Sequence, residues 1–226
     1  PRIMDQNPNV LAQQRASALA TNSVIRNTYL LLSMTLLFSA VTAGVSMALQ
    51  MPAMTYLVSI GVAFVLIWFV LPKHANRASG LAVVFGITGL LGFSLGPILN
   101  LYLAMPNGSQ VIATALGGTG AIFLALSFYA LSTKRDFSFL GGFLFTGFVV
   151  ILLAALANIF LAIPALSLTI SAAVIMIMSG FILYDTSRMI NGGETNYIMA
   201  TVGLYMSIFN IFINLLHILG IAGNND

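Results

Sequence analysis

The chain has 226 residues, of which 59% are hydrophobic and 6% charged, and its net charge is +3. A soluble domain has roughly a quarter of its residues charged, so this composition excludes a conventional water-soluble protein and predicts an all-α integral membrane protein. The absence of cysteine excludes disulfides, thiolate nucleophiles and cysteine-ligated metals.

In chain order, the sequence predicts a polar tail followed by seven apolar spans. Residues 1–24 contain no apolar run typical of a signal peptide, and we expect a mobile or partly helical tail. Each apolar stretch approaches the roughly 20 residues that cross a hydrocarbon core of about 30 Å. The spans are predicted at 27–49, 54–71, 79–103, 110–132, 139–162, 166–190 and 197–221, so that residues 25–222 form the transmembrane domain and 223–226 a short C-terminal tail.

The basic residues predict the orientation of these spans. All eight lie in the tail, in the second and fourth connections or at the end of the sixth span: Arg2, Arg15, Arg26, Lys73, Arg77, Lys134, Arg135 and Arg188. Since basic residues favour the cytoplasmic side, we expect a cytoplasmic N-terminus and a periplasmic C-terminus. The same residues are too scattered for a nucleic-acid partner, whereas the lipid bilayer is a necessary one.

Glycine recurs in the third, fourth and fifth spans, for example at Gly92 and Gly96. Small residues four positions apart allow helix backbones to approach closely within lipid. The sequence therefore predicts a tightly packed bundle.

Asp185 is the only acidic residue inside a predicted span, about five residues or roughly 8 Å from its cytoplasmic end. A buried carboxylate there is costly, so we expect it either to hold a proton or to pair with a cation. The possible counter-ions are Arg188, Lys73 and Arg77. One interpretation is an interfacial pair with Arg188. The other is an ion-binding or pH-sensing group at the inner mouth of a polar seam, open to protons or calcium; we expect no other metal and no cofactor.

The last span carries a stripe of small and polar residues at steps of three and four, which places them on one helix face. They are Ala200, Gly203, Ser207, Asn210, Asn214 and His217. Such a stripe either supplies hydrogen bonds between helices or forms the wall of an aqueous half-channel. Residues 194–196 are predicted to cap the N-terminus of this helix.

One pattern suggests an enzyme. Residues 92–96 read G-F-S-L-G, which matches the G-x-S-x-G motif of serine hydrolases, and Ser94 with His217 would form the dyad of an intramembrane serine protease. That motif needs a strand-to-helix turn, whereas Ser94 lies in the middle of an apolar span. We therefore predict that the protein is not an enzyme.

Two stretches resemble the signature of the Bax inhibitor-1 family. They are residues 184–186 (YDT) and 204–212 (LYMSIFNIF). Four others are similar to a bacterial branch that includes an inner-membrane modulator of the FtsH protease: residues 26–33 (RNTYLLLS), 95–100 (LGPILN), 136–142 (DFSFLGG) and 192–197 (GGETNY).

The resemblance implies a bacterial inner-membrane protein whose seventh helix is surrounded by the other six, and a function in binding and restraining FtsH, an ATP-driven membrane protease. Family members studied as pH-gated calcium leaks share a proton between two aspartates, one on helix six and one on helix seven. Asp185 matches the first, but Ser207 stands at the second position. The repulsion that makes such a pair pH-sensitive is therefore missing, although Ser207 can still hydrogen-bond to Asp185. A calcium or proton leak through Asp185, Asn210 and Asn214 remains the alternative function.

Overall fold

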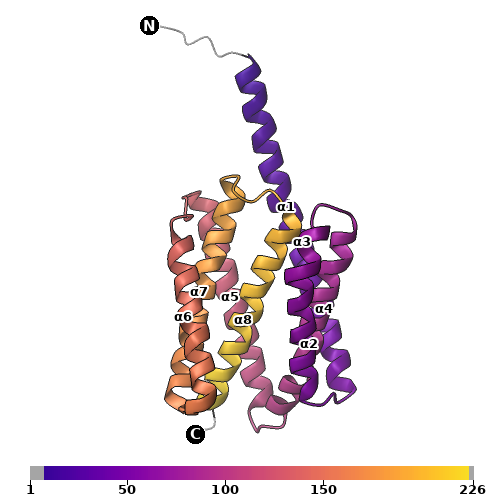
Figure 1. Ribbon diagram of the computed structural model, residues 1–226, viewed down its shortest axis with the longest axis vertical. Helices are drawn as coiled ribbons and strands as arrows, with labels where there is room; N and C mark the ends of the chain where they lie inside the picture. The colour runs from indigo at the N-terminus through magenta and orange to yellow at the C-terminus, as the bar shows by residue number, and fades with distance from the viewer. Residues whose placement is uncertain (1–7, 224–226) are drawn as a thin grey trace.

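A computed structural model describes residues 8–223, and all regular structure within them is helical (Figure 1). The elements are α1 (Pro8–Ala48), α2 (Met54–Val65), the π-helix η1 (Leu66–Val70), α3 (Leu71–His74), α4 (Ser79–Leu103), α5 (Gly108–Thr133), α6 (Leu140–Leu161), α7 (Pro164–Ile190) and α8 (Tyr197–Ala222). Seven helical segments are long and apolar enough to cross a membrane, with α2, η1 and α3 forming the second. The seven predicted spans are confirmed.

The first helix is much longer than its predicted span. It has 41 residues, and at 1.5 Å per residue it is about 60 Å long, twice the thickness of a hydrocarbon core. Its N-terminal part projects from the bundle (Figure 1), and most residues from 10 to 20 are exposed. The predicted tail is therefore a helix from residue 8 onward, and residues 1–7 lie outside the described part. We call the end of the bundle from which this helix projects the extension end.

The second span widens into a π-helix immediately before a proline. The N–H of Leu71 bonds to the carbonyl of Leu66, five residues earlier. Pro72 follows and has no N–H to donate, so the π-helical turn accommodates the break and the helix continues to His74. The predicted end of this span, at residue 71, falls three residues short.

The seventh span, α8, is central. It packs against α1, α4, α5 and α7, whereas α2 packs mainly against α4, and α6 against α7. In Figure 1, α6 lies at one edge of the bundle and α8 in its middle. The expected central position is found, with the difference that α2 and α6 form an outer layer that does not reach α8.

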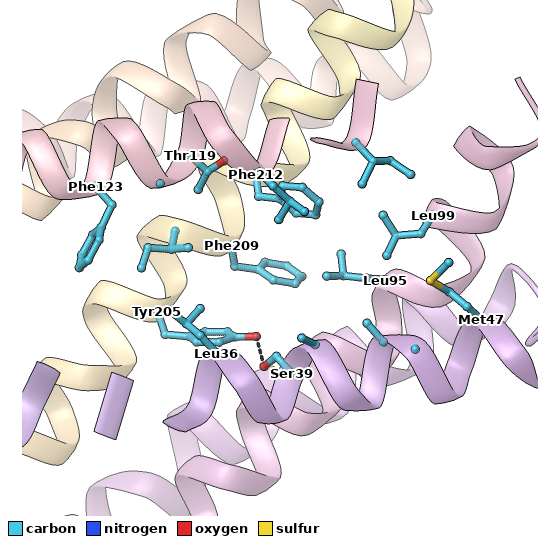
Figure 2. Close-up of a pocket in the computed structure, with 17 residues that line it drawn as sticks. Leu36, Ser39, Met47, Leu95, Leu99, Thr119, Phe123, Tyr205, Phe209 and Phe212 are labelled. Carbon is cyan, nitrogen blue, oxygen red and sulfur yellow. Dashed lines mark hydrogen bonds between the residues drawn. The ribbon is translucent and has the colours of Figure 1, made fainter. Parts of the chain in front are cut away.

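Helices α1, α4 and α8 meet through very close contacts. A Cβ added to Gly96 would collide with Ser46 of α1, which confirms the predicted role of glycine in packing at this position. The hydroxyl of Ser39 donates to the Thr88 carbonyl at 2.6 Å and lies 2.6 Å from Tyr205 Oη. Figure 2 draws the bond between Ser39 and Tyr205; because the Ser39 proton is used on Thr88, Tyr205 is the donor in it. One hydroxyl pair thus joins three helices.

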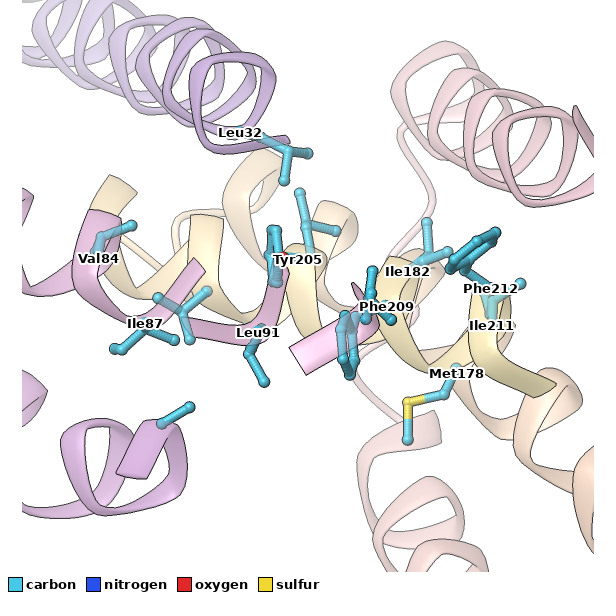
Figure 3. Packing of buried hydrophobic residues seen from close by; sticks show 14 of the residues in the cluster. Leu32, Val84, Ile87, Leu91, Met178, Ile182, Tyr205, Phe209, Ile211 and Phe212 are labelled. Atoms are coloured by element: carbon cyan, nitrogen blue, oxygen red, sulfur yellow. The ribbon is translucent and has the colours of Figure 1, made fainter. Parts of the chain in front are cut away.

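The apolar core fills the space around α8 with side chains from the neighbouring helices (Figure 3). Leu91 of α4, Ile182 of α7 and Ile211 of α8 are all at most 1% exposed. By contrast, Leu144 is the one buried residue of α6. Most of α6 is therefore available to lipid.

Candidate functional site

Asp185 lies on α7, near the extension end, and its side chain is turned toward α8. A Cβ added to Gly203 would stand 2.9 Å from Asp185 Oδ2, so the carboxylate packs directly on the backbone of the central helix. The residue is half-buried. Among residues 8–223, no hydrogen bond or ion pair to this carboxylate is formed. The one acidic residue within the spans is thus held in the bundle without a partner.

Arg188, the first predicted counter-ion, is engaged elsewhere. Its Nη2 donates to the Gly193 carbonyl at 2.9 Å and lies 3.8 Å from Glu194 Oε2. The guanidinium also stands over the ring of Tyr184, at 5.5 Å from the centroid. These contacts fasten the α7–α8 connection, and the interfacial Asp185–Arg188 pair is not formed.

Lys73 and Arg77, the other predicted counter-ions, are exposed, and neither forms an ion pair within the described chain. Their connection is tied to α8 by Asn196, whose Nδ2 donates to the Ala75 carbonyl at 2.9 Å. Asn196 Oδ1 accepts from the backbone N–H of Ile198 at 2.9 Å, which confirms the predicted N-cap. These two basic residues mark the extension end but do not neutralise Asp185.

Four buried hydroxyls near the extension end have no hydrogen-bond partner among the described residues. They belong to Thr28 and Tyr29 of α1, Ser127 of α5 and Thr186 of α7. Thr186 directly follows Asp185, and the Thr28 carbonyl accepts from Thr201 of α8 at 3.3 Å. Buried polar groups normally have hydrogen-bond partners. Four buried hydroxyls without one are therefore unusual for the interior of a membrane protein. Sequence reasoning missed these hydroxyls, because isolated Thr and Ser residues in apolar helices usually bond to their own backbone.

Ser207, at the position of the second family aspartate, is 2% exposed and lies one helical turn beyond Gly203. No hydrogen bond joins it to Asp185 in the described chain. Ser207 thus lies on the helix against which Asp185 packs, but the two side chains are not paired.

The other polar residues of the α8 stripe do not form a continuous network. Asn210 Nδ2 donates to the Met206 carbonyl and Asn214 Nδ2 to the Asn210 carbonyl, both at 2.8 Å, so both amides are occupied by their own helix. His217 differs, because its Nδ1 lies 2.9 Å from Ser171 Oγ of α7. The stripe therefore supplies one bond between helices.

The proposed serine-protease dyad is not assembled. Ser94 is fully buried, and its hydroxyl donates to the Leu91 carbonyl at 2.6 Å, while His217 is paired with Ser171. The hypothesis fails because Ser94 lies within a regular helix, where its hydroxyl bonds to the preceding turn instead of being exposed as a nucleophile.

The described residues contain no group of three or more His, Cys, Asp or Glu side chains arranged to hold a metal ion. Calcium takes about six to eight oxygen ligands, several of them carboxylates. Asp185 supplies a single carboxylate, which does not fit a resident calcium site. What the arrangement can do is stabilise a proton or a transient cation at one end of the bundle.

Comparison with known proteins identifies the family. A family model described as inhibitor of apoptosis-promoting Bax1 matches residues 21–224. The chain is 51% identical over 214 residues to an Escherichia coli K12 protein named modulator of FtsH protease YccA, covering 95% of this chain and 97% of that one. It is also 51% identical over 208 residues to an uncharacterized membrane protein of Vibrio cholerae, covering 92% and 93%. An uncharacterized protein of Pseudomonas aeruginosa is 46% identical over 218 residues, 96% of each chain.

Proposed function

The chain belongs to the Bax inhibitor-1 family, and from this premise we propose that it is a non-enzymatic inner-membrane protein that binds and restrains the membrane-anchored protease FtsH. The observation that carries the proposal is the 51% identity, over nearly the whole of both chains, to a relative named as a modulator of FtsH. A further E. coli relative with the same identity is named inner membrane protein YccA.

We further propose that the extension end is cytoplasmic. The seven basic residues within the described part of the chain lie in segments that start or end there, as the positive-inside rule requires of cytoplasmic connections. The exposed N-terminal part of α1 is then on the side where an ATP-driven membrane protease works.

In this mechanism the chain acts as a poor substrate of FtsH. Residues 10–20 are mostly exposed where α1 projects from the bundle, and an isolated helix of about this length is marginal in water, so the protease can unwind and grip it. The rest of the chain resists extraction, because α1 packs tightly against α4 further along, where Gly96 leaves no room for a Cβ beside Ser46. FtsH therefore stays engaged with a chain that it extracts only slowly.

Deletion of residues 2–20 tests this mechanism. In proteoliposomes that contain FtsH and a membrane-protein substrate, we expect the full chain to slow degradation of the substrate and the truncated chain to lose this effect. A matched control replaces residues 2–20 by a shuffled sequence of the same composition, which keeps a handle of equal length. Unchanged inhibition by the truncated protein would refute the poor-substrate mechanism.

A second candidate function, a cation or proton leak, is favoured by the polarity around Asp185. Ionisable residues that lie within a membrane and face the interior of a bundle commonly belong to ion or proton sites, and Asp185 packs on Gly203 of the central helix at the end of the bundle where four buried hydroxyls have no partner in the described chain. Asn210 and Asn214 contribute less than expected, because their amides are bonded to α8 itself. Flux into liposomes with calcium- and pH-sensitive dyes, measured for the native protein and Asp185→Asn, tests it. Equal flux in both proteins would exclude Asp185 as the gating group.

A further inference from the structure

An apolar chamber interrupts the core between α1, α4, α5 and α8. Its volume is about 450 Å³, within the roughly 300–1,000 Å³ range of ligand pockets. Figure 2 shows its walls, which include Leu36, Leu95 and Phe209 from three different helices. Ser39 and Tyr205 also line it, but their hydroxyls are paired with each other and with the Thr88 carbonyl. The side chains that line the chamber therefore present a hydrocarbon surface to a ligand and almost no free polar group.

The chamber opens sideways, toward the region that lipid occupies. Helices α1 and α5 do not pack backbone against backbone; the rings of Tyr29 and Phe123 approach to 6.1 Å near the extension end. Beyond that point the lining includes Gly44 on α1 and Gly120 on α5, and a Cβ added to either would meet no atom within 4 Å. Leu116 of α5, which also lines the chamber, is 57% exposed. The mouth is thus continuous with the lipid-facing surface.

The dimensions of the chamber limit the size of the molecule that can enter it. On α1 the lining runs from Leu36 to Met47, which is about 16 Å of helix at 1.5 Å per residue. A volume of about 450 Å³ spread over that length makes a narrow chamber, whereas a helix with its side chains is about 10–12 Å across. A single extended hydrocarbon chain fits, and a transmembrane helix of a partner protein does not.

The absence of charge in the lining further limits which kind of lipid can occupy the chamber. The lining contains no basic residue, so the polar end of any occupant stays outside, at the membrane surface. A phospholipid suits this arrangement best, because its second chain keeps it in the bilayer while the first enters between α1 and α5, whereas a single acyl chain anchors a molecule in the membrane only marginally. We propose that the chamber is a binding site for one acyl chain of a bilayer phospholipid, inserted laterally between these two helices.

Photo-crosslinking of the full chain in liposomes tests the proposal. The probe is phosphatidylethanolamine with a diazirine halfway along one acyl chain, and labelled peptides are mapped by mass spectrometry. Gly44→Leu and Gly120→Leu place a side chain in the chamber mouth from opposite walls. Gly117→Leu is the matched control, because Gly117 lies on α5 with equally open surroundings but does not line the chamber. Labelling of the widely exposed helix α6 measures non-specific contact with lipid.

We expect the native protein and Gly117→Leu to be labelled on residues 36–47 and 112–123 well above the α6 level. Both chamber variants should lose this excess while α6 labelling and the monodispersity of the protein stay unchanged. A photoreactive fatty acid, used at equal concentration, should not reproduce the excess. Labelling of the chamber at the α6 level in the native protein, or undiminished labelling in both chamber variants, would overturn the proposal, and preferential labelling by the fatty acid would overturn its phospholipid part.

Discussion

Replacement of Tyr205 by Phe removes one hydroxyl from the junction of α1, α4 and α8. The ring stays in place, and Ser39 still donates to the Thr88 carbonyl at 2.6 Å, so no donor is left unpaired. The loss is then one neutral hydrogen bond, and we expect the free energy of unfolding to fall by about 0.5–1.5 kcal/mol. Replacement of Ser39 by Ala removes the acceptor of the Tyr205 hydroxyl, which keeps only the longer bond of 3.3 Å to Thr88.

A double-mutant cycle isolates the interaction. The free energy of unfolding is measured in mixed micelles or bicelles for the native protein, Ser39→Ala, Tyr205→Phe and the double variant. Pairs of this kind within membrane proteins couple by about 0.6 kcal/mol on average and up to about 1.7 kcal/mol, and the 2.6 Å distance predicts a value in the upper part of that range. Tyr129→Phe, on a half-exposed tyrosine, is the control and should change stability little. A coupling energy near zero would refute the role of this pair in joining the helices.

Three further predictions concern packing and charge. Gly96→Val should destabilise the bundle by several times as much as Gly117→Val, because a Cβ at Gly96 meets Ser46 whereas one at Gly117 meets nothing within 4 Å; thermal unfolding in detergent compares the two, and equal melting temperatures would contradict the packing. Asp185→Asn should stabilise the protein in the same assay at neutral pH, since an unpaired carboxylate is costlier to bury than a neutral amide; a clear loss of stability would show that Asp185 has a favourable partner. Hydrogen bonds from Ser138 hold the pKa of Asp136 below its usual value, so the ordering of residues 134–139 should persist above the usual pKa of a free aspartate and be lost as pH falls through the lowered one. Backbone amide exchange of this connection should show that change, and Asp136→Asn should remove it.

The limits of the spans could be predicted closely wherever the chain carries strong interruptions. The span at 79–103 begins after a basic connection and ends before Met105 and Pro106, and its observed and predicted limits coincide. The extension of α1 was harder to predict, because its composition is polar and no apolar pattern marks it. Ala, Gln and Leu are good helix formers, and a helix already nucleated within the membrane extends through them at little further cost.

The candidate site could be predicted only in part. The sequence identifies Asp185 as exceptional, since no other predicted span holds an acid. Its spacing from Arg188 suggests an ion pair, yet Arg188 bonds to the Gly193 carbonyl, a partner that exists only once the α7–α8 connection has folded. The Ser39–Tyr205 pair spans 166 residues, and no local pattern in the sequence indicates a contact between them.

The rate at which FtsH degrades a membrane substrate, measured in proteoliposomes as a function of added full-length protein, tests the central claim most directly. The account predicts a rate that falls progressively as the protein is added, while a bundle of the same chain lacking residues 2–20 leaves it unchanged. A rate that stays constant up to a large molar excess of the full-length protein would contradict the claim that this chain restrains FtsH.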